Sequence, residues 1–266
     1  MKIIVCVKQV PDTSGKVAVN PDGTLNRASM AAITNPDDLN AVEAALVLKE
    51  QTGAEVVVVS MGPPPAEGML REIMARGADR AVLVSGREFG GSDTYATSQI
   101  LAAAINKIGV DAEDIVMCGR QAIDGDTAQV GPQIAEKLGL PQISYAADIQ
   151  LDGKNVIVKR MLEDGYMTVK TQTPCLITCI KELNEPRYMS VYGIFDCYSK
   201  PYEVLDYNAL KDDPLIDPST IGLMGSPTNI LTSFTPPQKG AGMMLEGADK
   251  ATCDQLAGML AAKHMI

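Results

Sequence analysis

Residues 115–138 read IVMCGRQAIDGDTAQVGPQIAEKL and contain the unit that decides the fold: a strand, a glycine-containing turn and a helix. The run Ile115 to Cys118 is wholly apolar, which predicts a strand buried on both faces, as in a parallel sheet. Asp126 to Leu138 is predicted to be a helix, because its large apolar residues recur at helical spacing.

The same unit recurs through the first half of the chain. Buried strands are predicted at Ile3 to Val7, Val56 to Val59 and Ala81 to Val84. Amphipathic patterns between the strands predict helices at Asp38 to Thr52, Pro64 to Arg76 and Ser92 to Ile108. Alternation of this kind predicts an α/β fold with a doubly wound, mostly parallel sheet and right-handed crossovers.

From residue 143 the spacing of apolar residues changes. Asp152-Gly153 separates the strand-like runs Tyr145 to Leu151 and Val156 to Leu162, which is typical of an antiparallel hairpin. Tyr166 to Thr171 extends that ribbon, and Cys175 to Ile180 is predicted to return to the main sheet.

The C-terminal third divides into two parts. Prolines interrupt residues 185–237, which also hold large apolar and aromatic residues, so we predict an extended arm that lies on a partner. Asp249 to Lys263 reads as a helix. The predicted domains are therefore 1–184 (nucleotide-binding α/β domain), 185–237 (recognition loop and arm) and 238–266 (C-terminal helix).

Composition excludes several classes of function. Lys and Arg total 23 against 33 Asp and Glu, so an extended nucleic-acid surface is not expected. No apolar run approaches the ~20 residues that span a bilayer, and we predict a cytoplasmic protein without membrane insertion. The six cysteines form no Cys-x-x-Cys pair and there is one histidine, so neither a metal site nor a histidine-centred catalytic triad is predicted.

The strongest candidate site is the turn from Gly119 to Gln129. Its glycines permit close backbone approach, and free amides at the next helix start suit a phosphate. Arg120 adds a cation, while Asp124 and Asp126 would repel a phosphate, unless Asp126 only caps the helix. The alternative interpretation is a capped surface turn.

Two weaker candidates also lead into helices. Phe89 to Ser98 has glycines and several hydroxyls, but Ser92 or Asp93 could simply be an N-cap. Thr34 to Asp38 by itself indicates a capping turn. Phosphate-loop, Gly-x-Gly-x-x-Gly and Gly-x-Ser-x-Gly motifs are missing, so no catalytic residue is assigned.

Taken in order, these segments resemble the β subunit of electron-transfer flavoproteins. The matching pieces are Val5 to Lys8, Asn35-Pro36, Val59 to Pro63, Gly77 to Arg80, Gly119 to Gln129, Leu183 to Tyr188 and Pro236 to Lys239. The resemblance implies an adenine-nucleotide-binding fold like that of universal stress proteins. It also implies a heterodimer with an α subunit that carries FAD.

The resemblance also implies site residues. The adenosine pocket would be lined by Cys6, Asn35, Pro36, Asp37, Asp38 and Met61. The phosphate would be wrapped by Gly119, Arg120, Gln121, Ala122, Ile123, Asp124, Gly125, Asp126, Thr127, Ala128, Gln129 and Val130. Docking on an acyl-CoA dehydrogenase would use a loop from residue 183 to 194 that begins with Leu183, Asn184, Glu185, Pro186, Arg187 and Tyr188.

The segment 91–98 is similar to the anaerobic, electron-bifurcating branch, where FAD replaces the AMP of the respiratory branch. Ser92, Asp93, Thr94 and Thr97 would serve the longer cofactor. The implied partners are NADH, ferredoxin or flavodoxin, and an acyl-CoA (butyryl-CoA) dehydrogenase. Two alternatives stay open: a non-bifurcating subunit that binds AMP, and a stress-protein-like ATP-binding module without redox function.

Overall fold

The computed structural model describes residues 1–12, 32–228 and 240–266 of the chain. Two compact units are present: the described part of the larger comprises residues 1–12 and 32–228, and that of the smaller comprises residues 240–266. Each unit is described by itself. The predicted arm residues 229–237 and the matching piece Pro236 to Lys239 lie outside the described residues.

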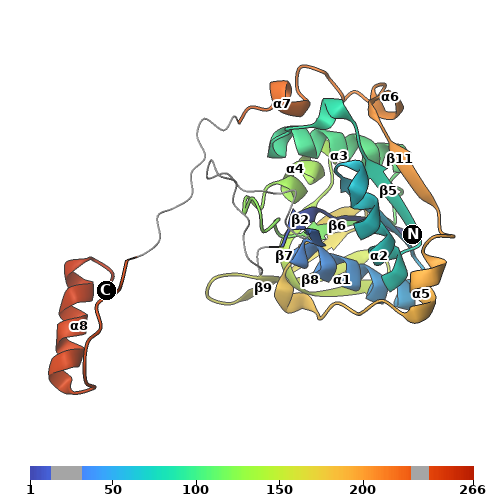
Figure 1. Cartoon of the computed structure of the whole chain (residues 1–266). Coiled ribbons are helices and arrows are strands. Elements are labelled where there is room, and N and C mark those ends of the chain that lie inside the picture. Colours follow the sequence, from blue (N-terminus) through green and yellow to red (C-terminus); the bar gives the residue numbers. More distant parts are fainter. Residues whose placement is uncertain (13–31, 229–239) are drawn as a thin grey trace. The chain divides into compact units, whose positions relative to one another are not determined.

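The large unit is built on a nine-stranded sheet with the order β11-β5-β4-β1-β6-β10-β7-β8-β9 (Figure 1). Neighbours from β11 to β7 are parallel, and β7, β8 and β9 pair antiparallel. The predicted mostly parallel α/β fold is therefore confirmed. The strands are β1 Lys2–Cys6, β4 Glu55–Met61, β5 Arg80–Val84, β6 Ile115–Gly119, β7 Gln142–Asp152, β8 Asn155–Met161, β9 Tyr166–Gln172, β10 Cys175–Cys179 and β11 Tyr202–Leu205.

Helices cover both faces of the sheet because the central strands are apolar on both sides. Alternate residues of β1 show this: Ile3 and Val5 pack with α1 and α2, whereas Ile4 and Cys6 pack with α3 and α4. Figure 1 shows the two helical layers. The helices are α1 Pro36–Thr52, α2 Glu67–Arg76, α3 Thr94–Ile108 and α4 Val130–Leu138, with single turns of 3-10 helix at Pro64–Ala66, Arg87–Phe89 and Lys181–Leu183.

The start of α4 differs from the sequence-based prediction. Asp126 and Ala128 have positive φ angles of 49° and 53°, which a right-handed helix does not contain. Residues 126–129 therefore belong to the loop, and the suggestion that Asp126 caps the helix is wrong. Gln129 occupies the N-cap position instead.

The hairpin prediction is confirmed, with a strand that serves two parts of the sheet. The first residues of β7 pair with β10, and its later residues pair with β8 up to Asp152 opposite Asn155. Tyr145, with a φ of 59°, lies where the pairing changes. A second small sheet, β2 Gln9–Pro11 with β3 Ala32–Thr34, was not predicted.

Much of the predicted arm packs on its own unit. β11 pairs with β5 at the sheet edge, and short helices α5 Val191–Asp196, α6 Tyr207–Leu210 and α7 Gly222–Gly225 surround it. Leu205, Leu210, Ile216 and Ile221 are buried in the core. The prediction that this whole stretch extends over a partner is therefore wrong for the part from β11 to residue 228, because the stretch completes the sheet edge.

The described part of the small unit, residues 240–266, contains α8 Lys250–Ala262, which confirms the predicted C-terminal helix. Asp249 caps it by accepting a hydrogen bond from the Thr252 amide. In residues 1–12, 32–228 and 240–266, no helix is at once long and apolar enough to cross a bilayer.

The edge strand offers a test of this packing. Leu205 is 2% exposed and its neighbour Val204 is 51% exposed. Leu205→Ala should lower the free energy of unfolding by about 2–4 kcal/mol, because it leaves a cavity in the core. Val204→Ala should change it by under about 1 kcal/mol. Urea denaturation of the full chain measures both, and equal effects would contradict the burial of β11.

Candidate functional site

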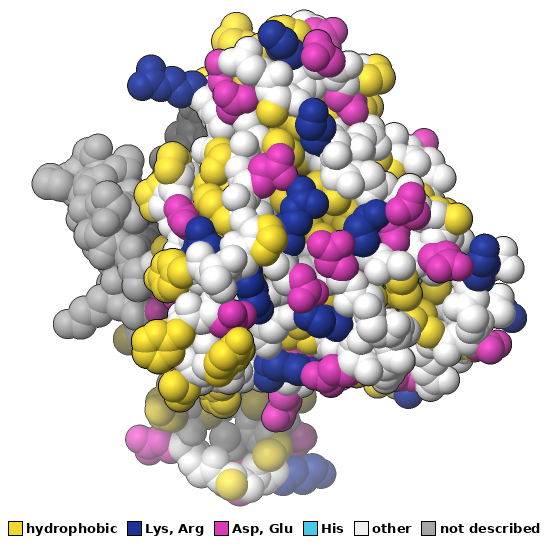
Figure 2. All heavy atoms as spheres, turned by 90° about the vertical axis from the view of Figure 1, so that its right-hand side faces the viewer, with side chains coloured by type: hydrophobic (Ala, Val, Ile, Leu, Met, Phe, Trp, Pro, Cys, Tyr) yellow, Lys and Arg dark blue, Asp and Glu magenta, His cyan; other side chains and the backbone are white. Residues whose placement is uncertain are grey.

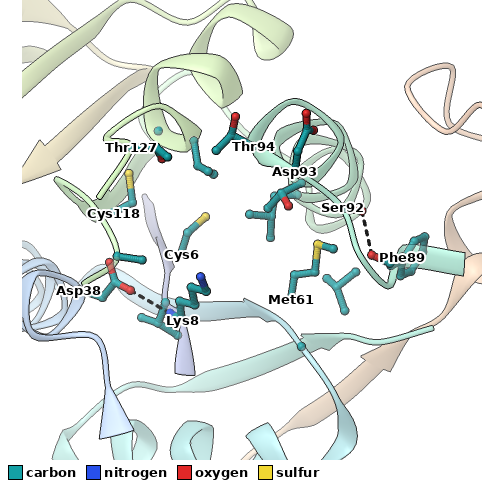
Figure 3. A pocket seen from close by; sticks show the side chains of 18 of the residues that line it. Cys6, Lys8, Asp38, Met61, Phe89, Ser92, Asp93, Thr94, Cys118 and Thr127 are labelled. Atoms are coloured by element: carbon teal, nitrogen blue, oxygen red, sulfur yellow. Dashed lines mark hydrogen bonds between the residues drawn. The ribbon is translucent and has the colours of Figure 1, made fainter. Parts of the chain in front are cut away.

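A cavity of about 910 Å³ lies at the carboxyl ends of β1, β4, β5 and β6. This edge is where open parallel sheets bind ligands. Figure 3 shows Cys6 in the middle of the opening, between Asp38 and Cys118 on one side and Met61 on the other. The loops after β5 and β6 meet here, since the Thr94 hydroxyl donates to Gln129 Oε1 at 2.9 Å.

Most of the cofactor-binding residues predicted from the sequence line this cavity. They are Cys6, Asp38, Met61, Ser92, Asp93, Thr94, Thr97, Gly119, Arg120, Gln121, Ala122, Thr127, Ala128, Gln129 and Val130. Seven predicted residues do not line it: Asn35, Pro36, Asp37, Ile123, Asp124, Gly125 and Asp126. The predicted residues therefore fall into two groups: those that line the cavity and those that hold the lining residues in place.

Asn35 is the clearest example of a residue that holds the lining residues in place. Its side-chain amide donates to Gln121 O at 2.8 Å, and its Oδ1 accepts from the Ile123 amide at 3.1 Å. These bonds fix the loop after β6 to the start of α1. The Asn35 side chain, with 0% exposure, therefore shapes the cavity without lining it.

The acidic residues of the loop are compensated by other side chains. Lys8 Nζ lies 2.8 Å from Asp124 Oδ1, and Gln121 Nε2 donates to Asp126 Oδ1 at 2.8 Å. Arg120 Nε lies 3.3 Å from Asp37 Oδ2. Asp124 and Asp126 thus repel a phosphate less than the sequence predicts, for two reasons. Both carboxylates have side-chain partners, and neither residue lines the cavity.

Asp38 is a buried carboxyl group at the base of the cavity. Its two oxygens accept the Lys8 amide at 2.8 Å and the Gly119 amide at 2.9 Å. Burial raises the pKa of Asp38 to about 7, although these hydrogen bonds oppose the shift. The carboxyl group joins the ends of β1 and β6, which are neighbours in the sheet.

The two cavity cysteines are neutral thiols. Cys6 and Cys118 are register partners on β1 and β6, and both are buried. Burial raises the pKa of Cys6 to about 12 and that of Cys118 well above its usual value. They provide an uncharged sulfur-lined wall rather than reactive thiolates.

Groups that can bind an anion also line the cavity, after several different strands. Gln129 makes no side-chain capping bond to α4 within the described chain, so the first amides of that helix remain available to an anion. Lys8, Arg87 and Arg120 also line the cavity. Among the described residues, the Arg87 guanidinium has no hydrogen bond or ion pair, in contrast to the other two cations.

Two residues of the loop after β5 have structural partners. The Ser92 hydroxyl donates to Phe89 O at 2.8 Å and accepts the Gly222 amide at 3.1 Å. Asp93 caps α3 by accepting the Ala96 amide at 3.0 Å. Of the two caps considered from the sequence, Asp93 is therefore the one formed.

Sequence reasoning did not assign about half of the cavity wall as cofactor-binding residues. Phe89, Gly90 and Gly91 belong to the candidate segment Phe89 to Ser98 but were not assigned individually. The residues outside every candidate segment are Val7, Lys8, Gly62, Pro63, Pro64, Val84, Ser85, Gly86, Arg87, Leu101, Cys118 and Gly131. Most directly end or follow β1, β4, β5 or β6, so applying the strand-end rule to every predicted strand would have found them.

The predicted partner-binding residues lie away from the cavity, in what we call the recognition segment (residues 183–198). Asn184 and Arg187 contact α1, while Tyr188 is 92% exposed. Within the described ranges, no group of three or more His, Cys, Asp or Glu side chains is arranged to hold a metal ion.

Comparison with known proteins identifies the family. A family model described as the electron transfer flavoprotein domain matches residues 22–204, more than half of the chain. The chain belongs to the electron transfer flavoprotein family. The resemblance found in the sequence is thereby confirmed, and the alternative of a stress-protein-like module without redox function is set aside.

Curated relatives of this electron transfer flavoprotein cover nearly the whole chain. It is 68% identical to the acryloyl-CoA reductase electron transfer subunit gamma of Anaerotignum propionicum, over 100% of both chains. It is 51% identical to the caffeyl-CoA reductase-Etf complex subunit CarD of Acetobacterium woodii, over 99% of this chain and 97% of the relative. Identity to the electron transfer flavoprotein subunit beta of Clostridium acetobutylicum is 49%, over 100% of both.

Gly119 offers a test of how tightly the cavity base is built. A Cβ at this position would collide with Asp38 Oδ1 and would lie 2.6 Å from the Asp37 carbonyl carbon. Gly119→Ala should therefore lower the free energy of unfolding by about 1–3 kcal/mol. Gly125→Ala, in the same loop but facing open space, is the matched control and should change it little. Comparable losses in the two variants would contradict the close approach of α1 to β6.

The pKa of Asp38 predicts a pH dependence of stability. Between its unfolded pKa near 4 and its folded pKa near 7, the folded state retains a proton that the unfolded state releases, so stability falls as pH rises. From pH 5 to pH 8 the wild type should lose about 2 kcal/mol relative to Asp38→Asn, in which this group does not titrate. Denaturant titrations at both pH values measure the difference, and a constant difference would contradict the raised pKa.

Proposed function

We propose that this chain is the β subunit of a heterodimeric electron-transfer flavoprotein and binds FAD in the cavity between the loops after β5 and β6. The observation that supports this most directly is the meeting of these two polar loops across one cavity of about 910 Å³. That volume is near the upper end of the range for small-molecule sites, about 300–1,000 Å³.

The chemistry of the wall fits a nucleotide with a diphosphate. FAD contains the whole of AMP, with a second phosphate, a ribityl chain and a three-ring isoalloxazine in addition. Neutral Cys6 and Cys118 suit a flat uncharged ring, while Lys8, Arg120 and the first amides of α4 suit phosphates. The loop after β5 brings Arg87 to the cavity and the first turn of α3 brings Thr94 and Thr97, which would serve the part of FAD that AMP lacks.

Bound FAD would supply hydride acceptance from NADH and electron delivery to ferredoxin or flavodoxin and, through the FAD of the α subunit, to an acyl-CoA dehydrogenase. The chain's own residues would bind and orient this cofactor. Phe89 is the one aromatic residue among the described residues of the wall, and it is 2% exposed. Contacts to the ring would therefore come mainly from aliphatic and sulfur-containing side chains.

The recognition segment is the proposed surface for the dehydrogenase. Its helix α5 and the flanking residues expose large apolar side chains: Tyr188, Val191, Tyr192, Ile194, Phe195 and Tyr198. Figure 2 shows the face of the molecule that carries α5 and β11, where exposed hydrophobic side chains lie among charges of both signs. One relative is named an electron transfer subunit of acryloyl-CoA reductase and another a subunit of a caffeyl-CoA reductase-Etf complex, and both names favour an acyl-CoA dehydrogenase or reductase as the partner. For α8, whose described residues are largely exposed, we propose docking on the α subunit.

Cofactor extraction from the co-expressed heterodimer tests the proposal. We expect two FAD per heterodimer, and NADH should bleach the flavin absorbance. Arg120→Gln should lower the retained FAD, because it removes a cation from the cavity, while Arg80→Gln, in an ion pair with Glu203 at the sheet edge, should not. One FAD with one AMP, or no bleaching by NADH, would contradict FAD binding by this subunit and favour the non-bifurcating alternative.

A further inference from the structure

The recognition segment is held against two helices by polar contacts on its inner side. α1 contacts it through Asn40 and Glu43, and α2 contacts it through Arg71 and Arg76. These contacts account for the fixed position of a stretch whose outer side chains have few neighbours. We propose that Glu43 and Arg187 are positioning residues for partner docking: their ion pair sets the orientation in which α5 is presented to the acyl-CoA reductase or dehydrogenase. This inference rests on the proposed function.

The contact between Glu43 and Arg187 uses both carboxylate oxygens. Arg187 Nε donates to Glu43 Oε2 at 2.9 Å, and Arg187 Nη2 donates to Glu43 Oε1 at 2.9 Å. The Arg187 backbone amide also donates to Glu43 Oε2 at 2.9 Å. Because side chain and main chain are held by one carboxylate, the contact fixes the direction of the chain and not only its distance from α1.

Two further contacts extend this attachment. Arg187 Nη1 donates at 2.5 Å to Oε1 of Glu50, which lies two turns after Glu43 on α1. One turn before Glu43, Asn40 Nδ2 donates to Asn184 O at 2.7 Å, and Asn184 Nδ2 donates back to Asn40 O at 3.0 Å. Asn40, Glu43 and Glu50 lie at spacings that place them on one side of the helix. The recognition segment therefore follows the side of α1 from residue 40 to residue 50.

The opposite side of the segment is attached to α2. Arg71 Nη1 donates to Cys197 O at 2.9 Å, and Arg76 Nη1 donates to Arg187 O. Gly193 packs directly on the Ala75 carbonyl, where a Cβ would collide. The Arg187 residue is thus held from both helices, through its side chain by α1 and through its carbonyl by α2.

Energetics favour a role in orientation over a role in stability. Glu43 is 8% exposed, so its charge is largely removed from water, and the desolvation of such a pair roughly offsets its attraction. A bidentate pair of this kind therefore adds little to the free energy of unfolding and mainly fixes the orientation of the recognition segment. Holding α5 in one orientation before binding removes the entropy that docking would otherwise lose in ordering it.

The test uses the full heterodimer with acryloyl-CoA reductase as the acceptor and measures KM for the reductase, kcat at saturating reductase, and hydrogen exchange of residues 188–198. Glu43→Gln keeps the size of the side chain and removes its charge and one acceptor. Arg187→Lys keeps the charge and removes the planar fork. In both variants we expect KM to rise about tenfold and kcat to change less than twofold. The rate of hydrogen exchange at the amides of residues 188–198 should also rise at least about tenfold. Glu50→Gln, which removes only the outer contact, should raise KM about twofold.

The control Asp111→Asn breaks an ion pair of similar length, 2.8 Å to Lys2 Nζ, that involves no residue of the recognition segment or of α5, and it should leave KM unchanged. Phe195→Ser, in the exposed face, separates the two hypotheses. If Phe195→Ser raises KM but Glu43→Gln and Arg187→Lys leave both KM and exchange unchanged, the positioning role is wrong and the docking surface stands. If Phe195→Ser has no effect on KM, the proposed docking surface is wrong, and the positioning role fails with it. Should a variant fail to fold, the milder Glu50→Gln and the exchange data on the wild type decide: rapid exchange of residues 188–198 in the wild type would contradict a fixed segment.

Discussion

The buried carboxyl group of Asp38 joins the ends of two central strands, and the cavity depends on that contact. Its oxygens accept the amides of Lys8, just after β1, and Gly119, at the end of β6. The contact is possible because Gly119 has no Cβ, so the start of α1 can approach the strand directly. With α1 in this place, Asn35 holds the loop after β6, and the cavity base becomes a set of strand ends fixed relative to one another.

The loop from Gly119 to Gln129 therefore has two functions at once. Some of its residues face the cavity, among them Arg120, Thr127 and Gln129. Ile123 instead binds the loop to the start of α1, Asp124 binds it to Lys8 after β1, and Asp126 binds it to Gln121 of the same loop. This division explains how an acidic sequence can border the site proposed for phosphates: the carboxylates are paired away from the cavity, and backbone amides and cations remain inside it. A linear motif does not separate these two kinds of residue, because both are contiguous in sequence.

α1 also connects the cavity with the surface that we propose for a partner. Its N-terminal turn carries Asp38, and its later turns carry Glu43 and Glu50, which hold Arg187. The same helix thus positions the cofactor wall and the recognition segment. If the subunit binds a flavin and docks a partner as proposed, one helix sets the positions of both sites.

The sequence by itself determined the fold class, the hairpin, the succession of the main strands and helices along the chain, and the family. Local patterns carry these: apolar runs mark strands buried on both faces, and motif blocks mark the loops. Tertiary structure alone decided that residues 202–205 join the sheet, that α4 begins at Val130, and which loop residues line the cavity. The reason is physical: β11 is a short edge strand whose pairing with β5 is set by a partner far away in sequence, and left-handed residues such as Asp126 have no reliable local signal. The ion pair of Glu43 with Arg187 belongs to the same class, since its two residues are 144 positions apart and meet only once α1 and the recognition segment are packed together.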